Sequence, residues 1–410
     1  MSALYDAFTR YPLISTDTRK IAPQSIFFAL RGASFDGNRF AAEALDKGAA
    51  MAVVDDPSVA TDKRYIVVED TLAALQALAC EHRRALGIPI LAIAGSNGKT
   101  TTKELVSRVL AERFALHATQ GNLNNHIGVP LTLLAMDRSV EFGVVEMGAS
   151  SCGEIAALCA IAEPNYGLLT NVGRAHLEGF GGVEGVRRGK GELYDYLAAT
   201  GGTAFVRAED PILTAMADER EGLRRIGYST EAANRITHHL EGEYNRYNVA
   251  AAVAVGAHFG VEQAAVERAI GGYQPENNRS QRLTTPHNTL LLDCYNANPS
   301  SMQLSVENLL REPLAGRSYK MLILGDMREL GAWSGEEHRR IIQQVAQGDA
   351  RAIFVGEEFG KALAAEGYEA LWFASCEALC AHLQAEPPRN ALILLKASRG
   401  IGLERTIELL

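Results

Sequence analysis

The apolar residues of this chain form short runs that alternate with segments of helical periodicity. Between residues 90 and 206 four runs are almost continuously apolar, at 90–94, 142–147, 166–170 and 203–206. Strands without a polar face must be buried on both sides, so this rhythm predicts a mainly parallel sheet with helices over both faces.

The chain on either side of this region has its own pattern. Up to about residue 85, strands at 25–30 and 50–54 and helices at 40–47 and 71–84 predict a small α/β domain. In the last third, strands at 289–294, 320–324, 352–355, 370–373 and 392–395 alternate with helices, which is typical of an open, doubly wound, Rossmann-like sheet.

Two breaks divide the chain. Gly87-Ile88-Pro89 interrupts a helical segment, and residues 271–278 form a polar stretch that contains Gly and Pro. A chain of 410 residues exceeds one ordinary domain of roughly 150 residues. We therefore predict three α/β domains, at 1–86, 87–276 and 277–410.

Composition narrows the class of function. Hydrophobic residues make up 47% and charged residues 22% of the chain, as in globular proteins. The net charge of -9 disfavours nucleic acid as a partner. No apolar run approaches the roughly 20 residues that cross a bilayer, and the N-terminus has no signal-peptide pattern. We expect a cytoplasmic protein without membrane insertion, acting as a monomer.

The six cysteines are scattered and form no framework of zinc ligands or disulfides. We interpret them as reduced core residues. Cys376 and Cys380 are one helical turn apart, and buried thiols in a helix explain this spacing better than a ligand pair.

The clearest chemical signal is a glycine-rich segment between the strand at 90–94 and an amphipathic helix. Such a turn directs backbone N–H groups and the positive end of a helix dipole at one anion. We expect Lys99 to reach the β- and γ-phosphates of a nucleoside triphosphate, and the Thr100 hydroxyl to coordinate Mg²⁺. Two residues separate the glycines, instead of the four of the general Walker pattern. The segment is Gly95-Ser96-Asn97-Gly98-Lys99-Thr100-Thr101.

Three more residues are candidates for the same site. Glu146 ends an apolar strand, and a carboxylate at the carboxyl edge of a parallel sheet suits Mg²⁺. His176 follows the next strand, and Lys190 lies between two glycines. Each also has an ordinary explanation. Glu146 fits an exposed carboxylate at a strand end, His176 a surface or capping imidazole, and Lys190 a solvated charge.

A series of segments in order along the whole chain is more distinctive. The series resembles the Mur ligases of peptidoglycan synthesis. Two asparagine-rich segments, at 121–125 and 295–299, resemble the dipeptide-adding branch, and the Asp-Asn-Pro-Arg signature of the diaminopimelate-adding branch is absent. Besides the glycine-rich segment, the series comprises Thr16-Asp17-Thr18-Arg19, Gly121-Asn122-Leu123-Asn124-Asn125, Glu146-Met147-Gly148, Ala175-His176-Leu177-Glu178, Lys190-Gly191-Glu192, Asn245-Arg246-Tyr247-Asn248, Asp293-Cys294-Tyr295-Asn296-Ala297-Asn298-Pro299, Leu324-Gly325-Asp326-Met327-Arg328-Glu329-Leu330-Gly331 and Lys396-Ala397-Ser398-Arg399.

The resemblance implies an ATP-dependent amide ligase that adds D-alanyl-D-alanine to a UDP-N-acetylmuramoyl-tripeptide through an acyl phosphate. Lys99, Glu146, His176 and Lys190 are then the catalytic residues. Two Mg²⁺ ions are implied, held by Thr100, Glu146, His176 and a carbamylated Lys190. A carbamate is anionic, whereas a free ammonium would be repelled by two divalent cations.

The resemblance also assigns binding residues. Asn245 and Asn248 would face the adenine, although helix capping is an alternative for both. Arg279 and Asp293 would contact the nucleotide from the third domain. The first domain would bind the UDP part of the substrate. Substrate contacts are implied for Asp17, Thr18, Arg19, Asn122, Asn124, Asn125, Tyr295, Asn296 and Asn298, with ordinary turn and cap chemistry as the alternative for each.

Several points stay open from the sequence. The third residue of the peptide is lysine or diaminopimelate. Another ligase of this fold, such as a folylpolyglutamate synthase, and a nucleotide-gated binding protein without chemistry are the competing functions. Ala397 and Arg207 depart from the family pattern, which has Gly and Asn at these places.

Overall fold

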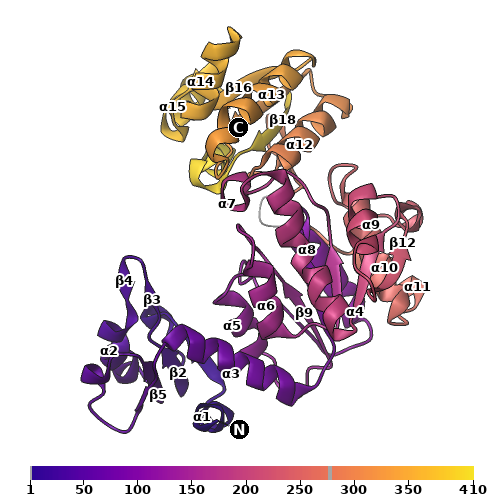
Figure 1. The fold of residues 1–410 in the computed structure, drawn as a ribbon. Helices are drawn as coiled ribbons and strands as arrows, with labels where there is room; N and C mark the ends of the chain where they lie inside the picture. Colours follow the sequence, from indigo (N-terminus) through magenta and orange to yellow (C-terminus); the bar gives the residue numbers. More distant parts are fainter. Residues whose placement is uncertain (1, 276–278) are drawn as a thin grey trace.

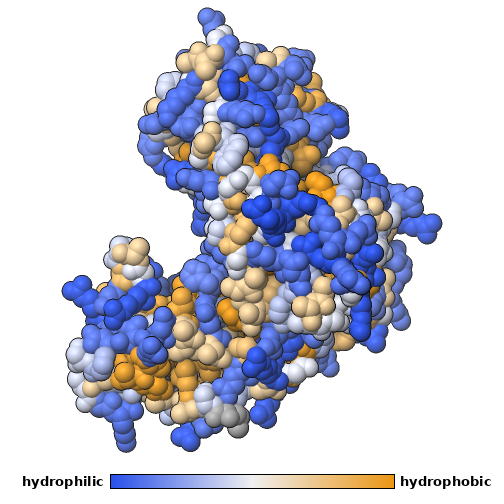
Figure 2. Space-filling model, in the orientation of Figure 1, coloured by the Kyte–Doolittle hydropathy of each residue, from blue (hydrophilic) through white to orange (hydrophobic). Residues whose placement is uncertain are grey.

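The computed structural model describes residues 2–275 and 279–410. Three larger sheets, each with its own helices, follow one another along the chain and form three lobes (Figure 1). A space-filling view shows a wide notch between the first and third lobes (Figure 2). The predicted α/β class with mainly parallel sheets is confirmed. The predicted boundary at 276/277 lies outside the described residues, and the domain limits stay a prediction.

The N-terminal lobe contains a parallel sheet in the order β1-β2-β5-β6. A small antiparallel hairpin, β3–β4, projects from it (Figure 1). The elements are α1 (Ala3–Arg10), β1 (Leu13–Ser15), η1 (Thr18–Lys20), β2 (Ser25–Phe28), β3 (Arg31–Gly32), β4 (Phe35–Asp36), η2 (Gly37–Phe40), α2 (Ala41–Asp46), β5 (Met51–Val54), η3 (Pro57–Val59) and β6 (Tyr65–Val67).

Helix α3 (Thr71–Leu86) connects the first lobe to the second. It begins at Asp70, whose carboxylate caps the first turn, and ends at Gly87, which has a φ of 64°. The helix packs against α5 (Gly128–Leu134) and α6 (Glu154–Ala162) of the central lobe. The end of α3 is therefore part of the central packing as well as of the N-terminal lobe.

The central lobe has a six-stranded, fully parallel sheet in the order β12-β11-β10-β7-β9-β8. Alternate residues of the middle strand β7 belong to different hydrophobic clusters: Ala92 shares one with buried residues of α6 and α8, and Ile93 shares the other with buried residues of α4 and α10. The elements are β7 (Ile90–Ala94), α4 (Lys99–Ala111), β8 (Leu116–Ala118), β9 (Phe142–Glu146), β10 (Tyr166–Leu169), α7 (Leu177–Phe180), α8 (Val183–Thr200), β11 (Thr203–Arg207), α9 (Pro211–Asp218), β12 (Arg224–Tyr228), η4 (Thr230–Arg235), α10 (Asn245–His258) and α11 (Gln263–Gly271).

The order of these strands brings the predicted residues together. Strand β7, which leads into the glycine-rich segment, lies between β9 and β10. Strand β9 ends at Glu146, and β10 leads into the segment that contains His176. Because the strands are parallel, all three carboxyl ends meet at one edge of the sheet.

The C-terminal lobe has a second six-stranded sheet, in the order β13-β14-β18-β15-β16-β17. Only the edge pair β13–β14 is antiparallel among the described strands of this sheet. The elements are β13 (Gln281–Thr284), β14 (Thr289–Leu292), α12 (Pro299–Arg311), β15 (Tyr319–Gly325), η5 (Gly331–Trp333), α13 (Ser334–Ala346), β16 (Arg351–Val355), α14 (Glu357–Glu366), β17 (Leu371–Phe373), α15 (Cys376–Ala385), β18 (Ala391–Lys396), η6 (Arg399–Ile401) and η7 (Leu403–Leu409).

Some details differ from the sequence prediction. Cys152 is exposed, because it lies in the turn before α6 and not in an apolar strand. Cys159, Cys294 and Cys376 are buried, as predicted, and Cys80 and Cys380 are partly buried. In the part of the chain that the structure describes, no helix is long and apolar enough to cross a membrane.

Of the two departures from the family pattern, Ala397 is accommodated, whereas Arg207 has a buried nitrogen, Nη1, without a hydrogen-bond partner among the described residues. Ala397 is fully buried and has no left-handed backbone, so the position does not require glycine here. Arg207 ends β11, pairs with Asp210 and places its guanidinium 4.1 Å from the centre of the Tyr247 ring.

Candidate active site

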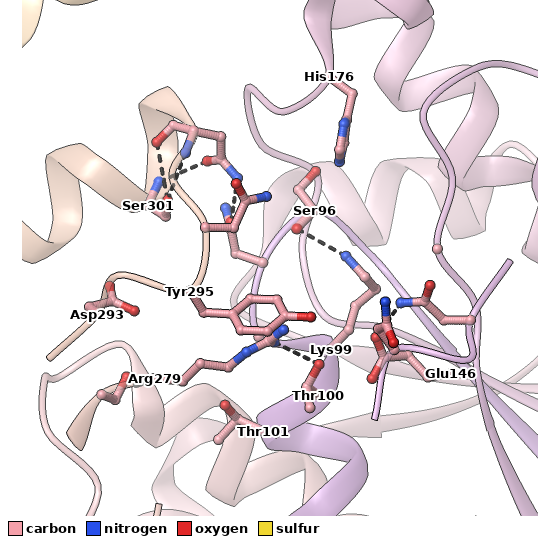
Figure 3. A pocket seen from close by; sticks show the side chains of 18 of the residues that line it. Ser96, Lys99, Thr100, Thr101, Glu146, His176, Arg279, Asp293, Tyr295 and Ser301 are labelled. Atoms are coloured by element: carbon pink, nitrogen blue, oxygen red, sulfur yellow. Dashed lines mark hydrogen bonds between the residues drawn. The ribbon is translucent and has the colours of Figure 1, made fainter. Parts of the chain in front are cut away.

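A cavity of about 520 Å³ lies at the carboxyl edge of the central sheet and is closed from the other side by the C-terminal lobe (Figure 3). Most of the residues predicted from the sequence line it together. They are Ser96, Asn97, Gly98, Lys99, Thr100, Thr101, Asn122, Asn124, Asn125, Glu146, His176, Asn245, Asn248, Arg279, Asp293, Tyr295, Asn296 and Asn298.

The backbone of the glycine-rich loop is held by the segment that follows β10. Thr170 donates its hydroxyl hydrogen to the carbonyl of Asn97 at 2.6 Å, and the N–H of Asn97 donates to the Asn171 side chain at 3.1 Å. Gly95 has a φ of 136°, and a Cβ there would lie 2.1 Å from the Thr170 hydroxyl. Only glycine allows this approach.

The loop ends at the first turn of α4. Helix α4 begins at Lys99 with Gly98 as its N-cap, so the N–H groups of its first turn have no partner within the helix. These groups and the helix dipole favour an anion at this point. The loop thus has the geometry of a phosphate-binding site.

The Lys99 ammonium folds back onto its own loop. It donates to the carbonyl of Gly95 at 2.8 Å and to the carbonyl of Ser96 at 3.1 Å; the bond to Ser96 is drawn in Figure 3. Burial lowers the pKa of Lys99, and the carboxylate of Glu146 opposes this shift. A bound polyphosphate would offer this cation a stronger partner than the two carbonyl groups.

Thr100 contacts the C-terminal lobe. Arg279 donates through Nη1 to the Thr100 hydroxyl at 2.6 Å, and its guanidinium lies 3.7 Å from the centre of the Tyr295 ring (Figure 3). A cation stacked on an aromatic ring is held in place. Arg279 therefore adds positive charge to the phosphate loop from across the cavity.

Glu146 is almost completely buried at the end of β9. Its Oε1 atom accepts a hydrogen bond of 2.7 Å from the Asn124 amide. Its Oε2 atom is buried and has no hydrogen-bond partner in the described part of the chain. A buried carboxylate oxygen without a donor is costly, and a bound cation would remove this cost.

His176 faces a residue that the sequence did not single out. Its Nδ1 atom lies 2.5 Å from a carboxylate oxygen of Glu329, without the alignment of a hydrogen bond. Both residues have left-handed backbones, with φ values of 52° and 63°. The contact with His176 holds the pKa of the Glu329 carboxyl below its usual value. The pair connects the central and C-terminal lobes at the rim of the cavity.

Lys190 lies behind the cavity wall and does not line it. Its side chain is fully buried in α8, donates to the carbonyl of Ala149 at 2.9 Å and lies over the Phe180 ring. Burial and the ammonium of Lys99 lower the pKa of Lys190 to about 7. At neutral pH a substantial share of this amine is therefore uncharged and nucleophilic.

The two asparagines of α10 bond to each other. Asn248 donates to Asn245 at 2.7 Å and accepts from the Thr102 hydroxyl at 3.0 Å. Asn245 donates to the carbonyl of Glu241 at 2.6 Å, a bond that belongs to the start of the helix. Among the described residues, neither side chain accepts a hydrogen bond from the first N–H groups of α10, so the structure does not support the capping alternative, and both side chains line the cavity.

On the C-terminal side, Asp293 is held by two groups that the sequence analysis assigned no role. Lys396 donates to Asp293 Oδ2 at 2.5 Å, and the Ser305 hydroxyl donates to the same oxygen at 2.8 Å. Lys396 is fully buried in spite of its charge. The sequence feature that could have pointed to Lys396 is its position in a segment that resembles the family.

The remaining predicted residues divide into two groups. Asn125 accepts from the N–H groups of Ile127 and Gly128 in the turn that leads into α5, which is the turn chemistry that the sequence left open. Asp17, Thr18 and Arg19 lie in the N-terminal lobe and do not line the cavity. Arg19 is bound by Asp17 and is otherwise exposed.

The cavity also contains polar residues that the sequence analysis did not name as site residues. Half of them are serines, which carry little signal in a single sequence. They are Ser150, Glu154, Tyr244, Ser280, Ser301, Ser305, Glu329 and Lys396.

Comparison with known protein families accounts for most of the chain. Residues 10–83 match the model described as Mur ligase family, catalytic domain, residues 93–241 the Mur ligase middle domain, and residues 278–399 the Mur ligase, glutamate ligase domain. The chain belongs to the Mur ligase family. The family predicted from the sequence is confirmed.

Individual Mur ligases match along nearly the full length. The UDP-N-acetylmuramoyl-tripeptide--D-alanyl-D-alanine ligase of Bacillus subtilis (strain 168) is 32% identical, covering 96% of this chain and 92% of that protein. A crystal structure of MurF from Acinetobacter baumannii has a TM-score of 0.85 at 29% identity, over 96% of this chain and 92% of that one. The MurF ligase of Thermotoga maritima, in complex with ADP, has a TM-score of 0.83 at 26% identity, over 100% and 98%.

The residues of the cavity can be tested for their fit to a divalent cation. No group of three or more His, Cys, Asp and Glu side chains with metal-binding geometry occurs among the described residues. The unpaired oxygen of Glu146, the imidazole of His176 and the hydroxyl of Thr100 line the same cavity, and each is a group that can bind a cation. A complete ligand set needs a further anionic group, such as a phosphate.

Proposed function

We propose that this chain is an ATP-dependent ligase that joins D-alanyl-D-alanine to a UDP-N-acetylmuramoyl-tripeptide. The observation that supports it best is the single cavity in which a phosphate loop of one lobe faces the asparagine-rich segment of another. Relatives that match along nearly the whole chain have this activity in their names. ATP as the phosphoryl donor agrees with the ADP in the related Thermotoga maritima structure.

The reaction has two balanced steps. The terminal carboxylate of the tripeptide attacks the γ-phosphorus of ATP; an O–P bond forms, the bond to the ADP oxygen breaks, and ADP leaves. The amine of the dipeptide then attacks the acyl carbon of the acyl phosphate. A C–N bond forms, the amine loses a proton, and phosphate leaves.

The protein contributes charge and position. Lys99 and the first turn of α4 hold the phosphates, and Arg279 neutralises them from the opposite lobe. Neutralisation matters because two anions, carboxylate and triphosphate, must approach each other. Enclosure between two lobes keeps water from the acyl phosphate.

We further propose that Thr100, Glu146 and His176 hold Mg²⁺, which would neutralise phosphate charge. The buried, unpaired Oε2 of Glu146 supports this assignment. Lys190 is proposed to react with CO₂ as the neutral amine: its nitrogen attacks the carbon, an N–C bond forms, and a proton is released to solvent. The lowered pKa of Lys190 favours this reaction. The anionic carbamate would then supply the missing ligand.

The binding of the long substrate involves two lobes in this proposal. Asp17, Thr18 and Arg19 of the N-terminal lobe would contact its UDP end. Asn122 and Asn124 would lie along its path to the phosphate loop, and Tyr295 and Asn296 would meet the dipeptide. Asn245 and Asn248 would face the adenine, and Asp293 would contact the nucleotide from the C-terminal side.

We place the reaction in the cytoplasm, where ATP is available. We also propose that the protein acts as a monomer.

ADP release measured with two UDP-tripeptides, carrying lysine or diaminopimelate, tests the activity and identifies the third residue. We expect D-alanyl-D-alanine to stimulate release together with amide formation, and glutamate or free diaminopimelate not to do so. A response to glutamate alone would favour a folylpolyglutamate synthase type of ligase. ATP binding without any turnover would favour a nucleotide-gated binding protein.

A separate variant tests the carbamate. Lys190→Ala is expected to lose activity and to regain part of it with short-chain carboxylic acids, which restore an anion at that place. Full activity of this variant without an added acid would contradict the carbamate.

A further inference from the structure

The N-terminus of helix α12 contacts the phosphate loop directly. Asn298 donates through Nδ2 to the side-chain oxygen of Asn97 at 2.7 Å. Asn298 belongs to the C-terminal lobe and Asn97 to the central lobe. This bond therefore crosses the boundary between the lobes next to the predicted γ-phosphate site.

The side chain of Asn298 is fixed on its own lobe. Its Oδ1 atom accepts from the N–H of Ser301 at 3.0 Å, and its own N–H donates to the Ser301 hydroxyl at 3.1 Å. These two bonds form a capping box at the start of α12. The side chain is also buried. Its amide is thus occupied by protein groups, which leaves little of it for a substrate.

Asn97 is fixed just as firmly on the other lobe. Its carbonyl accepts from the Thr170 hydroxyl and from the Asn171 amide, and its N–H donates to Asn171. Neither asparagine can move far without moving the helix or the loop to which it belongs.

A second contact lies beside the first. The N–H of Arg174 donates to the Ser300 hydroxyl at 2.8 Å. A Cβ added to Gly173 would lie 2.8 Å from the same hydroxyl, so the two lobes approach closely here. The two contacts together place the first turn of α12 against the loop and against the segment after β10.

The position of Asn298 in the chain links this contact to the other side of the cavity. Tyr295 and Asn296, three and two residues earlier, line the cavity, and Tyr295 stacks on Arg279. A shift of α12 away from the loop would move these residues with it.

We propose that Asn298 is a positioning residue that keeps the amine-binding side of the cavity in register with the phosphate loop. This inference rests on the proposed ligase function. Phosphoryl transfer depends mainly on the central lobe, whereas attack by the amine requires both lobes in the correct relative position. Loss of the Asn97–Asn298 bond therefore impairs the second step more than the first, and water consumes the acyl phosphate.

Two substitutions remove the bond and keep the helix cap. Asn298→Thr and Asn298→Ser both retain an N-cap oxygen, and neither has an amide that can donate to Asn97. Ser375→Ala removes the N-cap of α15 in the same lobe, far from the loop in the chain, and serves as the control for a lost cap. Melting temperatures confirm that each variant is folded.

The measurement compares ADP released with amide formed, at saturating ATP, UDP-tripeptide and D-alanyl-D-alanine. For the wild type and Ser375→Ala we expect a ratio near one. For both Asn298 variants we expect ADP release within roughly threefold of the wild type and amide formation reduced about 10- to 100-fold, so that the ratio rises well above one.

A double substitution tests whether the two asparagines act through each other. The double variant with Asn97→Ala and Asn298→Ser is expected to form amide no more slowly than the slower of the two single variants, because each substitution removes the same bond. The proposal would be overturned if the ratio of ADP to amide stayed near one in the Asn298 variants, or if it rose equally in Ser375→Ala. Losses of amide formation that add up in the double variant would overturn it as well. If the wild type itself formed no amide, the proposed function would fail instead.

Discussion

At the scale of single residues, the unpaired oxygen of Glu146 is the most informative feature of the cavity. The sequence placed this carboxylate at a strand end, where exposure is the usual outcome. The structure buries it and provides one donor, Asn124, for two oxygens. The residue therefore carries a local energetic cost that binding of a cation would offset.

Glu146→Gln is predicted to separate stability from activity. Without ligands the variant should be as stable as the wild type or up to about 1 kcal/mol more stable, because it removes a buried charge. Amide formation should fall at least about 100-fold. Mg-ATP should raise the melting temperature of the wild type more than that of the variant.

Glu141→Gln is the matched control, because Glu141 immediately precedes β9, at the opposite end from Glu146, and is exposed. It should change neither activity nor the effect of Mg-ATP. Equal effects of Mg-ATP on wild type and Glu146→Gln would contradict the metal assignment.

Lys190 gives a prediction about pH. The pKa of this buried amine falls from 10.5 to about 7 on folding. Between these values the unfolded chain binds more protons, so the free energy of unfolding rises with pH in this window and levels off below about pH 7.

Lys190→Met should remove this contribution. In CO₂-free buffer, the free energy of unfolding of the wild type should rise by about 2 to 3 kcal/mol more than that of the variant between about pH 7.5 and 9.5. Denaturant unfolding at several pH values measures the difference. Parallel curves for the two proteins would mean that Lys190 has an ordinary pKa.

At the scale of elements, the phosphate loop depends on its contact with the end of β10. Thr170 and Asn171 hold the loop backbone, and the close approach of Thr170 to Gly95 excludes a side chain there. The loop is therefore shaped by the neighbouring strand as much as by its own glycines.

Gly95→Ala should destabilise the protein by about 2 to 4 kcal/mol, because it adds steric overlap to an unfavourable φ. ATP affinity should fall at least about tenfold, since the loop must shift. Gly87→Ala is the matched comparison, with a φ of 64° and open space around its Cβ position. It should cost about 1 kcal/mol and leave ATP affinity unchanged. Similar effects of the two substitutions, measured by unfolding and nucleotide titration, would contradict this explanation.

At the scale of the whole molecule, α3 is shared between two lobes. Arg83 near its end donates to the carbonyls of Ala162 and Glu163 and to the Asn165 side chain in the central lobe. A domain boundary at 86/87 matches the break in the sequence pattern. This boundary would, however, separate α3 from the surface of α5 and α6 that α3 covers.

Two fragments test where the central unit begins. A fragment of residues 71–275 should unfold cooperatively, whereas residues 87–275 should melt at a lower temperature or aggregate. The reason is the loss of several buried apolar contacts, each worth about 1.5 to 3 kcal/mol. Equal melting temperatures in thermal unfolding would show that α3 is dispensable for the central lobe.

The sequence alone determined the central strands, the phosphate loop and the family. Long, apolar strands such as β7, β9 and β18 are buried whatever their neighbours, so local pattern suffices to predict them. The edge strands β8, β12 and β13 were missed, because β8 is short and β12 and β13 have polar, exposed positions. Their strand state depends on pairing with a distant segment.

Only the tertiary structure decided which polar atoms have partners. The Thr100–Arg279, Asn97–Asn298 and His176–Glu329 contacts join residues more than 150 positions apart, and no local pattern encodes them. Burial of Lys190 and Glu146 likewise results from packing. Chain segments determine which chemical groups are present, whereas the approach of the lobes determines their distances and their pKa values.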